Sequence, residues 1–409
     1  MVHWGKGSFR GKEVEKMDKK KTAKLMLAAT FLLWFSVYTY PSFLSAYAQE
    51  ELMASAVMVG AITGSYGFTQ MILRIPLGLL SDIKKTRKPF LVMGAAASVV
   101  AALGLMLCRN QVGALIFRGV SGVAASTWVT YSVMYSSCFD HGDTGNAMSR
   151  LSFYQYGSQV AAMILGAFLA DKVGKAAAFA LAAAAGVAGI CVTMKIQDLP
   201  PEGERQTVRD FLSVLRDRRL LCGTALSTIF HFVCWGTVLG FTVNWAKGVV
   251  GLTTAQLGFL SAAYLVPNTI CARASGILEK KVSRRLLLTG GFAIVAAASF
   301  LYGQTATAVQ LFAVQAFFGC GMGLIVPMTM ADAIANIPDS RRSAAMGFYQ
   351  SIYGVGMFLG PMIAGGVVDA FKAGENLVPG YQANFMLMAI VSILGGLLAF
   401  LVSGEKKKN

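Results

Sequence analysis

The sequence contains few charged residues for its length of 409 residues. Asp, Glu, Lys and Arg together make up 14% of the chain, whereas about a quarter of the residues in a soluble domain are charged. Hydrophobic residues make up 55%. This composition has too little charge to cover a water-exposed surface, so we expect most of the chain to lie in lipid.

The motifs of several enzyme classes are also missing. The nucleotide-binding pattern Gly-x-x-x-x-Gly-Lys-Ser/Thr does not occur, and the sequence contains no nucleophile–base arrangement and no metal-ligand cluster. The seven cysteines are scattered, and most lie in apolar stretches, where Cys behaves as a small hydrophobic residue. We therefore expect a protein that is not an enzyme, binds no cofactor or metal and has no disulfide framework.

The net charge of +16 comes from basic residues in short loops between apolar stretches, so no nucleic-acid partner is expected. Loops on one side hold Lys84, Lys85, Arg87, Lys88, Lys280, Lys281, Arg284, Arg285, Arg341 and Arg342, and the tail Lys406-Lys407-Lys408 belongs with them. Loops on the other side hold only Arg109, Lys172, Lys175, Lys247 and Lys372. The positive-inside rule predicts that the first side, with both termini, is cytoplasmic.

Twelve uncharged or nearly uncharged stretches are long enough to cross a bilayer, which takes about 20 residues in a helix. Residues 286–331 carry no charge and are too long for one span, so we divide them at the turn-like Gly303-Gln304-Thr305. The first stretch is too long for a cleaved signal peptide. The predicted spans are 25–48, 53–80, 89–108, 112–137, 147–170, 176–195, 220–245, 254–278, 286–304, 308–331, 343–368 and 381–403.

These spans predict two helical bundles joined by a polar linker. Phe211, Leu212 and Leu215 in the linker fall on one helical face, which predicts an amphipathic helix on the membrane surface. The predicted parts are a cytoplasmic tail at 1–24, a six-helix bundle at 25–195, a cytoplasmic linker at 196–219, a second six-helix bundle at 220–403 and a cytoplasmic tail at 404–409.

Short patterns recur in the two halves at a nearly constant offset. Asp82 precedes Arg87 by five residues, and 197 residues later Glu279 precedes Arg284 by the same spacing. Two further patterns repeat in the same order, Phe153-Tyr154-Gln155 as Phe348-Tyr349-Gln350 and Leu165-Gly166 as Leu359-Gly360. The constant order and offset indicate that the second half is a duplicate of the first.

The first of these patterns is Gly78-x-x-x-Asp82 followed by Arg87-Lys88. It resembles the loop signature between the second and third helices of the major facilitator superfamily of transporters. The resemblance covers nearly the whole chain, since the motif recurs in the second half. It implies an all-α membrane protein with twelve transmembrane helices in two parallel six-helix repeats, which tilt in turn about a site at mid-depth.

The same resemblance implies gating roles for the charged residues of both loops. Asp82, with Arg87, would lie near the N-terminus of the eleventh helix, where the helix dipole favours an anion. Glu279, with Arg284, would act likewise near the fifth helix. We expect these four residues to hold the inner gate shut when the protein faces outward.

Two arginines are predicted to lie within spans, where a charge is costly unless it is paired or hydrated. Arg74 lies eight residues before Asp82, about 12 Å inward, and Arg273 lies six residues before Glu279, about 9 Å inward. Facing each other across a cavity, they would bind a carboxylate or a similar oxyanion. Alternatively, both arginines extend to the inner surface or pair with the nearby acids.

Both arginines also lie in segments that resemble anion porters of the same superfamily. Leu73-Arg74-Ile-Pro76 resembles the second helix of nitrate/nitrite porters, and Ala272-Arg273-Ala-Ser-Gly276 resembles the eighth helix of those porters and of oxalate–formate exchangers. The matching arginines bind the anion in these relatives. Gly356-x-x-x-Gly360-Pro361 resembles the motif of drug-efflux antiporters, which carry it in the fifth helix.

Two further residues are candidates for coupling transport to protons. Arg118 with Gly122 resembles the fourth-helix motif of proton-coupled members, and His231 is titratable within the seventh span. Each also has a structural interpretation, as an Arg bound to neighbouring carbonyls and as a buried, hydrogen-bonded His. No Asp or Glu lies in the middle of spans one, four, five, seven, ten or eleven, and a drug/proton antiporter usually has one there.

Aromatic and amide side chains recur four residues apart in the spans that line the pore of the family. This spacing places two side chains on one helix face, either for substrate contact or for packing between helices. The pairs are Trp34 and Tyr38, Gln70 and Arg74, Gln155 and Gln159, His231 and Trp235, and Tyr349 and Tyr353.

These observations predict a monomeric secondary transporter in the cytoplasmic (inner) membrane of a bacterium. We expect the substrate to be a small organic anion held by Arg74 and Arg273, moved with protons or by exchange, with membrane lipid around the protein. Efflux of drugs or metabolites by antiport is an alternative, and flipping of lipids through a laterally open cavity is another. A non-transporting receptor of this fold would carry a large soluble signalling extension.

Overall fold

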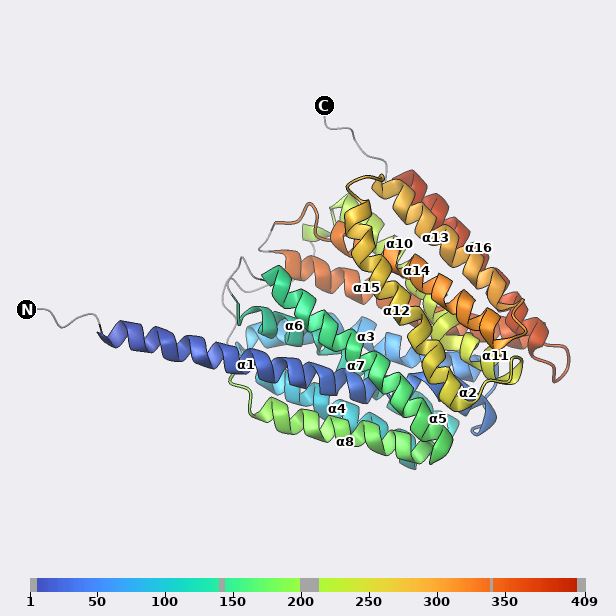
Figure 1. Cartoon of the computed structure of the whole chain (residues 1–409), viewed down its shortest axis with the longest axis horizontal. Helices are drawn as coiled ribbons and strands as arrows, with labels where there is room; N and C mark the ends of the chain where they lie inside the picture. The colour runs from blue at the N-terminus through green and yellow to red at the C-terminus, as the bar shows by residue number, and fades with distance from the viewer. Residues whose placement is uncertain (1–5, 140–143, 199–212, 339–340, 403–409) are drawn as a thin grey trace, which may run out of the picture.

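The computed structural model is helical throughout, with no β-strand among the described residues 6–139, 144–198, 213–338 and 341–402 (Figure 1). Ten helical segments within these residues have the length and apolar composition needed to cross a membrane. Two more long helices, α7 (Thr144–Lys172) and α12 (Thr254–Leu278), pack among them. These two helices contain more polar residues than the other ten. Together the twelve helices confirm the predicted all-α fold.

The helices divide into two groups along the chain. The first half contains α1 (Lys6–Tyr38), α2 (Pro41–Glu50), α3 (Ala56–Ile83), α4 (Lys88–Leu107), α5 (Gln111–Ser126), α6 (Trp128–Ser136), α7 and α8 (Lys175–Met194). The second half contains α10 (Arg218–Gly236), the π-helical segment η2 (Thr237–Phe241), α11 (Thr242–Gly248), α12, α13 (Arg284–Tyr302), α14 (Ala308–Asp332), α15 (Arg342–Phe371) and α16 (Val378–Val402). Phe211 and Leu212 of the predicted amphipathic helix lie outside the described residues.

The first span of each half is broken at a corresponding place. In the first half, α1 ends at Tyr38 and α2 begins at Pro41, whose missing N–H fits the first turn of a new helix. In the second half, α10 passes into η2, and Asn384 donates a hydrogen bond to the carbonyl of Gly236 at 3.1 Å. Backbone that leaves regular helix within a membrane needs such partners. The sequence analysis did not predict these breaks, because both lie within stretches that carry no charge.

The two halves touch along two pairs of helices, α3 with α15 and α7 with α12. Glycines bring the backbones close together. A Cβ atom at Gly60 would collide with the carbonyl of Pro361, and one at Gly258 would lie 2.7 Å from the carbonyl oxygen of Met163. Small residues at helix interfaces allow this approach in membranes, where packing rather than water exclusion drives association.

Polar contacts join the halves at one end of the molecule, which we call the closed end. Gln49 Oε1 accepts hydrogen bonds from Asn244 and, at 2.9 Å, from the Tyr381 hydroxyl. The backbone N–H of Val57 donates to Asp369 Oδ2 at 2.9 Å, and Glu50 forms an ion pair with Lys247. Every one of these bonds crosses from the first half to the second, so they hold the closed end together.

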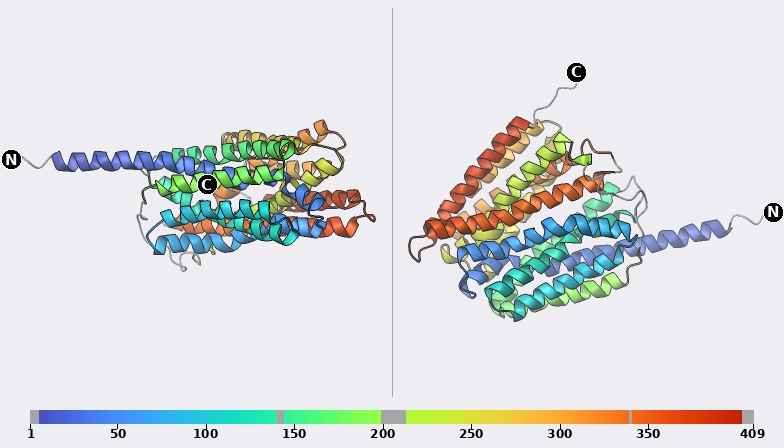
Figure 2. Two further views of the ribbon diagram at one scale, coloured as in Figure 1. Left: turned by 90° about the horizontal axis from the view of Figure 1, so that it is seen from below. Right: turned by 180° about the vertical axis from the view of Figure 1, so that it is seen from behind.

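The opposite end carries the basic loops α3–α4 and α12–α13, and we call it the basic end. The two halves spread apart towards this end, so that the molecule is wedge-shaped (Figure 2). Arg74 and Tyr353 make a hydrogen bond between the halves well inside this end. The structure therefore has one end shut and the other parted.

Candidate functional site

A cavity of about 230 Å³ lies between the two halves and is lined by both. Aromatic residues are the largest group in its wall, which also contains amide side chains and methionines. Arg74 lines it, and so do seven other residues for which the sequence analysis gave substrate contact or packing as the role: Trp34, Tyr38, Gln155, His231, Trp235, Tyr349 and Tyr353. Gln70 and Gln159, which share helix faces with two of these residues, line it as well.

Arg74 carries the cationic charge of this cavity. Its side chain is 3% exposed and is held in place by neutral partners from both halves. One guanidinium nitrogen donates to Tyr353 at 2.9 Å, and another donates to Gln70 Oε1 at 2.6 Å. No Asp, Glu or Lys lies among the described residues of the lining, so the charge of Arg74 is left uncompensated there.

Rings from the second half lie beside Arg74. The His231 ring is stacked on the Tyr353 ring, with centroids 4.1 Å apart and planes 7° apart. His231 Nδ1 lies 2.8 Å from the carbonyl oxygen of Ser227, and the Ser227 hydroxyl donates to Tyr349 at 2.9 Å. These bonds orient His231 and Tyr349, and Tyr353 is held by its stacking on His231 and its hydrogen bond with Arg74, as expected for a preformed wall.

The structure does not bring Arg273 to the cavity. Its side chain is exposed, and it follows Val266 and Ile270 on one face of α12, which are 52% and 65% exposed. The predicted pair of arginines facing each other is therefore not formed in this structure. The distance from Glu279 gave the depth of Arg273 along the helix but not the direction in which it points.

Several lining residues were not predicted. Trp128 packs edge-on against Trp34 with centroids 5.4 Å apart, and Tyr66 stacks on Trp235 at 5.2 Å and 16°. Tyr156 and Tyr264 also line the cavity. Trp128 and Tyr156 have no aromatic or amide residue four positions away, so the spacing rule did not single them out. Tyr66 and Tyr264 do have an amide at that spacing, Gln70 and Asn268, and the sequence analysis did not use these two pairs.

Some polar atoms buried around the cavity have no hydrogen-bond partner within the protein. Three of them are donors, namely Trp34 Nε1, Gln70 Nε2 and Arg74 Nε. One is an acceptor, Gln350 Oε1. A buried polar group without a partner is costly, so such groups commonly mark the place of a ligand or an ordered water. The excess of donors favours a ligand rich in acceptor atoms.

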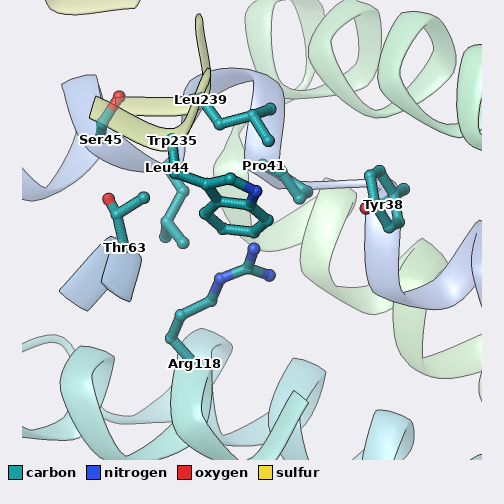
Figure 3. Close-up of a pocket in the computed structure, with 8 residues that line it drawn as sticks. All are labelled: Tyr38, Pro41, Leu44, Ser45, Thr63, Arg118, Trp235 and Leu239. Carbon is teal, nitrogen blue, oxygen red and sulfur yellow. The ribbon is translucent and has the colours of Figure 1, made fainter. Parts of the chain in front are cut away.

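Arg118 lines a second, smaller pocket together with residues such as Ser45, Thr63 and Trp235 (Figure 3). This pocket has a volume of about 10 Å³ and shares Tyr38, Trp235 and Leu239 with the cavity wall. Arg118 is 3% exposed, and its guanidinium carbon lies 4.3 Å from the centre of the Tyr66 ring. Arg118 does not line the main cavity, but residues such as Trp235 line both spaces.

The gate predicted for the first half is only partly described. The side chain of Asp82 lies outside the described residues. Arg87 is buried and donates to the Ser137 hydroxyl at 2.8 Å. Asp198, which was not predicted, accepts the backbone N–H groups of Arg87 and Lys88 at 3.0 and 3.1 Å. A carboxylate at this position caps the N-terminus of α4 and fixes the loop.

The corresponding cluster of the second half is fully described. Arg284 forms ion pairs with Glu279 and, at 3.1 Å, with Asp332 at the end of α14. Asp332 also pairs with Arg219 of α10 at 3.0 Å. The predicted gate residues Glu279 and Arg284 are therefore in contact, and Asp332 links them to two further helices of the same half. The sequence analysis missed Asp332, because its partners are distant in the chain.

Two six-helix halves around a cavity that both of them line define the class of secondary membrane transporters. The model of the Major Facilitator Superfamily matches this chain over residues 26–247 and again over residues 224–409. The chain belongs to this family. It is accordingly a multi-pass membrane transporter and not an enzyme, as the sequence predicted.

Named relatives and a solved structure agree with this assignment. The inner membrane transport protein YajR of Escherichia coli is 26% identical over 367 residues, covering 85% of this chain and 76% of YajR. The multi-drug resistance efflux pump PmrA of Streptococcus pneumoniae is 26% identical over 323 residues, covering 75% of this chain and 76% of PmrA. A bacterial homolog of the human lysosomal transporter Spinster, solved in an inward-facing and unoccupied conformation, superposes with a TM-score of 0.76 at 14% identity, covering 94% and 97% of the two chains.

Proposed function

We propose that this protein is a secondary active transporter that moves a small organic anion across the cytoplasmic membrane of a bacterium. The observation that carries the proposal is the environment of Arg74, a buried cation with neutral partners in a cavity without a lining carboxylate. Such a site attracts a carboxylate or similar oxyanion and repels an organic cation.

The rest of the cavity wall is suited to the body of such a substrate. Rings from both halves provide flat apolar surfaces, and Trp34 Nε1 and Gln70 Nε2 are donors without a partner in the protein. An aromatic or otherwise amphipathic acid would place its anionic group at Arg74 and its apolar body between the rings. The cavity volume of about 230 Å³ favours a small molecule.

Alternating access would supply the transport step. In the described conformation the closed end is shut by bonds across the halves, and the basic end is parted. In the opposite conformation Asp82 would cap the N-terminus of α15, just as Asp369 now accepts the backbone N–H of Val57 near the start of α3. The basic end would face the cytoplasm by the positive-inside rule, with both termini on that side.

Coupling is proposed to be by exchange or by protons. His231 is the titratable side chain in the lining that lies against a potential anion site, since it stacks on the ring whose hydroxyl binds Arg74. The protein is proposed to act as a monomer, because both halves of the site belong to one chain.

Efflux of amphipathic drugs or metabolites is the second candidate. The aromatic rings and methionines of the lining favour it, since such surfaces adapt to varied apolar ligands. The similarity to the efflux pump PmrA over most of both chains points in the same direction. The two candidates differ in the role of Arg74, which is central to anion transport and dispensable for cation efflux.

A ligand-stability screen of the purified full-length protein separates the candidates. We expect carboxylates to raise the melting temperature of the wild type and of Arg273→Ala, but not of Arg74→Ala. Arg273→Ala is the matched control, because this arginine lies at a similar predicted depth but outside the cavity. Stabilisation by lipophilic cations that survives Arg74→Ala would overturn the anion proposal and favour efflux.

A further inference from the structure

A further hollow lies on the outer surface of the helix bundle, apart from the substrate cavity. It has a volume of about 520 Å³, and α3 and α5 of the first half and α15 of the second half bound it. Each of its described lining residues keeps part of its surface exposed, and none of them lines the cavity around Arg74. We call it the lateral groove, and its lining includes Ser65, Phe68, Gly119 and Phe358.

The lateral groove lies along parts of these helices that cross the membrane. It follows α5 from Leu115 to Val123, a length of about 12 Å, and begins about 6 Å from Gln111, the first residue of α5. Gln111 lies at the closed end, where its side chain donates to the carbonyls of Leu52 and Met53. One leaflet of a bilayer has a hydrocarbon layer about 15 Å deep. The groove therefore opens onto the acyl chains of the leaflet at the closed end.

The lining of the groove offers little to a polar ligand. None of its described residues is charged. Its two hydroxyl groups are already used within their own helix, since Ser65 donates to the carbonyl of Ile62 at 2.8 Å and Thr69 donates to the carbonyl of Ser65 at 3.1 Å. A site for a polar solute has a few free polar groups that fix its orientation. The groove is suited instead to a ligand made of hydrocarbon.

The shape of the groove depends on a glycine and on a pair of rings. A Cβ atom at Gly119 would lie 3.5 Å from Thr69 Oγ1 and 3.8 Å from Ser65 Cβ, so a side chain there would enter the groove without a collision. The rings of Phe68 and Phe358 pack together with their centroids 5.0 Å apart. Phe68 belongs to the first half and Phe358 to the second, so the groove is complete only where the halves meet.

We propose that the lateral groove binds one acyl chain of a membrane phospholipid, which stays there longer than the lipid around the rest of the protein. An unfilled hollow forfeits the dispersion contacts of its walls, and a thin, flexible chain restores them. The site lies outside the substrate cavity and does not depend on what the protein transports.

A helix of another protein molecule is a poorer occupant. Helices associate in lipid through close backbone approach or through hydrogen bonds between them. Phe68 and Ile116 are 42% and 53% exposed, and these large side chains keep another backbone away from Gly119. The hydroxyls of the groove have their partners in α3, so they have no bond to offer a second helix.

The position of the groove links the bound chain to the conformation of the protein. The helices α3 and α15 lie side by side (Figure 2), and a Cβ atom at Gly64 would lie 2.6 Å from the carbonyl oxygen of Phe358. Opening of the closed end would part α3 from α15 and remove the wall that α15 supplies. The bound acyl chain therefore stabilises the conformation with the closed end shut.

Native mass spectrometry of the full-length protein tests the proposal. The protein is reconstituted in vesicles of dioleoylphosphatidylcholine and then transferred to a mild detergent, and we expect the wild type to retain one phospholipid. Gly119→Leu fills the groove, so the apparent affinity for the lipid should fall about tenfold. The control is Gly290→Leu in α13, where a Cβ atom would meet nothing within 4 Å, and it should retain the lipid. Equal retention by the two variants would overturn the proposal.

Photolabelling of the wild type gives a test that needs no folded variant. Phosphatidylcholine with a diazirine in the middle of one acyl chain is irradiated in vesicles, and the labelled residues are mapped. We expect several-fold more label in the groove than at Ile393 and Leu397 of α16, which are 54% and 55% exposed and lie outside the groove. Equal labelling of the two surfaces would overturn the proposal. Arg74→Ala should keep the groove label, so a failed anion-substrate proposal leaves this one standing.

Discussion

At the scale of single residues, the buried and half-buried arginines differ in what balances their charge. Arg284 is paired with two carboxylates, whereas Arg74 is bound by neutral side chains and Arg118 lies against tyrosine rings. A paired arginine stabilises the fold and has little left for a ligand. The two arginines without a carboxylate partner keep their charge unpaired, and at Arg74 this is the basis of the proposed anion site. The chemistry of the neighbours therefore separates paired from unpaired arginines in this protein.

Asp332 can be used to test whether the arginines that are paired with carboxylates stabilise the fold. It is 7% exposed and pairs with both Arg219 and Arg284, so Asp332→Asn removes a charge from two ion pairs. We expect a loss of about 2 to 3 kcal/mol of unfolding free energy, since one hydrogen-bonded charge is lost while two cations stay behind. Thermal unfolding in detergent measures the change. The control is Asp171→Asn, whose partner Lys172 is 62% exposed, and which should change stability little. Equal effects of both variants would contradict this role.

At this scale the sequence predicted much of the cavity wall, but the arginine pair that it also predicted does not form in the structure. Trp34 and His231 were found because residues four apart share a helix face, and the spans that line the pore were known from the family resemblance. The position of Arg273 along its helix could be read from the sequence, but the rotation of a helix about its axis depends on packing with neighbours. Asp332 and Asp198 were missed for a related reason, since their partners lie far away in the chain.

At the scale of helices, the contact between α3 and α15 depends on residues without side chains. Gly60 contacts the backbone of Pro361, and Gly64 contacts that of Phe358. Each glycine allows the two helices to approach until main-chain atoms touch, which a larger residue would prevent. The closed end lies at the end of this helix pair. We therefore expect this end to close only when the two helices pack closely together.

Gly60→Val should therefore separate the two helices. A Cβ atom at this position would collide with a main-chain carbonyl, which cannot move away as a flexible side chain does. Overpacking of this kind costs about 1 to 3 kcal/mol, and we expect the melting temperature to fall accordingly. Gly290→Ala is the control, because a Cβ atom at this α13 glycine would meet nothing within 4 Å. A melting temperature unchanged by Gly60→Val would show that α3 and α15 do not rely on this contact.

The spans themselves were predictable, and their breaks were not. Charge-poor stretches of about 20 residues mark membrane helices because every backbone polar group must be satisfied within lipid. The break before Pro41 and the segment η2 lie inside such stretches. Their free carbonyls are satisfied by residues such as Asn384, from a helix that is distant in sequence. A hydropathy pattern records the apolar composition of a span but not these local partners.

At the scale of the whole molecule, the sequence predicted two repeats but not the conformation they adopt. Both conformations of a two-state transporter share one sequence and differ by only a few kcal/mol, so composition and motifs cannot choose between them. Contacts such as the hydrogen bond from the backbone N–H of Val57 to Asp369 show which of the two conformations is present. The antiparallel pair α3 and α15 carries Asp369 at one end and Asp82 at the other. We expect these two carboxylates to cap opposite helix N-termini in alternate conformations.

Gln49 provides the sharpest test of the closed end. Its Oε1 accepts hydrogen bonds from Asn244 and Tyr381, both in the other half, so Gln49→Ala removes two bonds that exist only while this end is shut. The expected cost to this conformation is about 1 to 2 kcal/mol, which changes the ratio of the two conformations by about 5- to 30-fold. The distance between spin labels at Lys85 and Lys281, in the basic loops of the two halves, can be measured by double electron–electron resonance. In Gln49→Ala a larger fraction of molecules should show a short distance between the two labels.

The matched control is another glutamine at the same end. Gln111 Nε2 also donates two hydrogen bonds, to the carbonyls of Leu52 and Met53 at 3.1 and 3.2 Å, but all three residues belong to the first half. Gln111→Ala therefore removes as many bonds without touching the contact between the halves, and the label distances should stay as in the wild type. An equal shift in both variants would mean that local stability, rather than the bonds across the halves, sets the conformation. A shift confined to Gln49→Ala would establish that these bonds hold the end shut, because they are the contacts that only this variant loses.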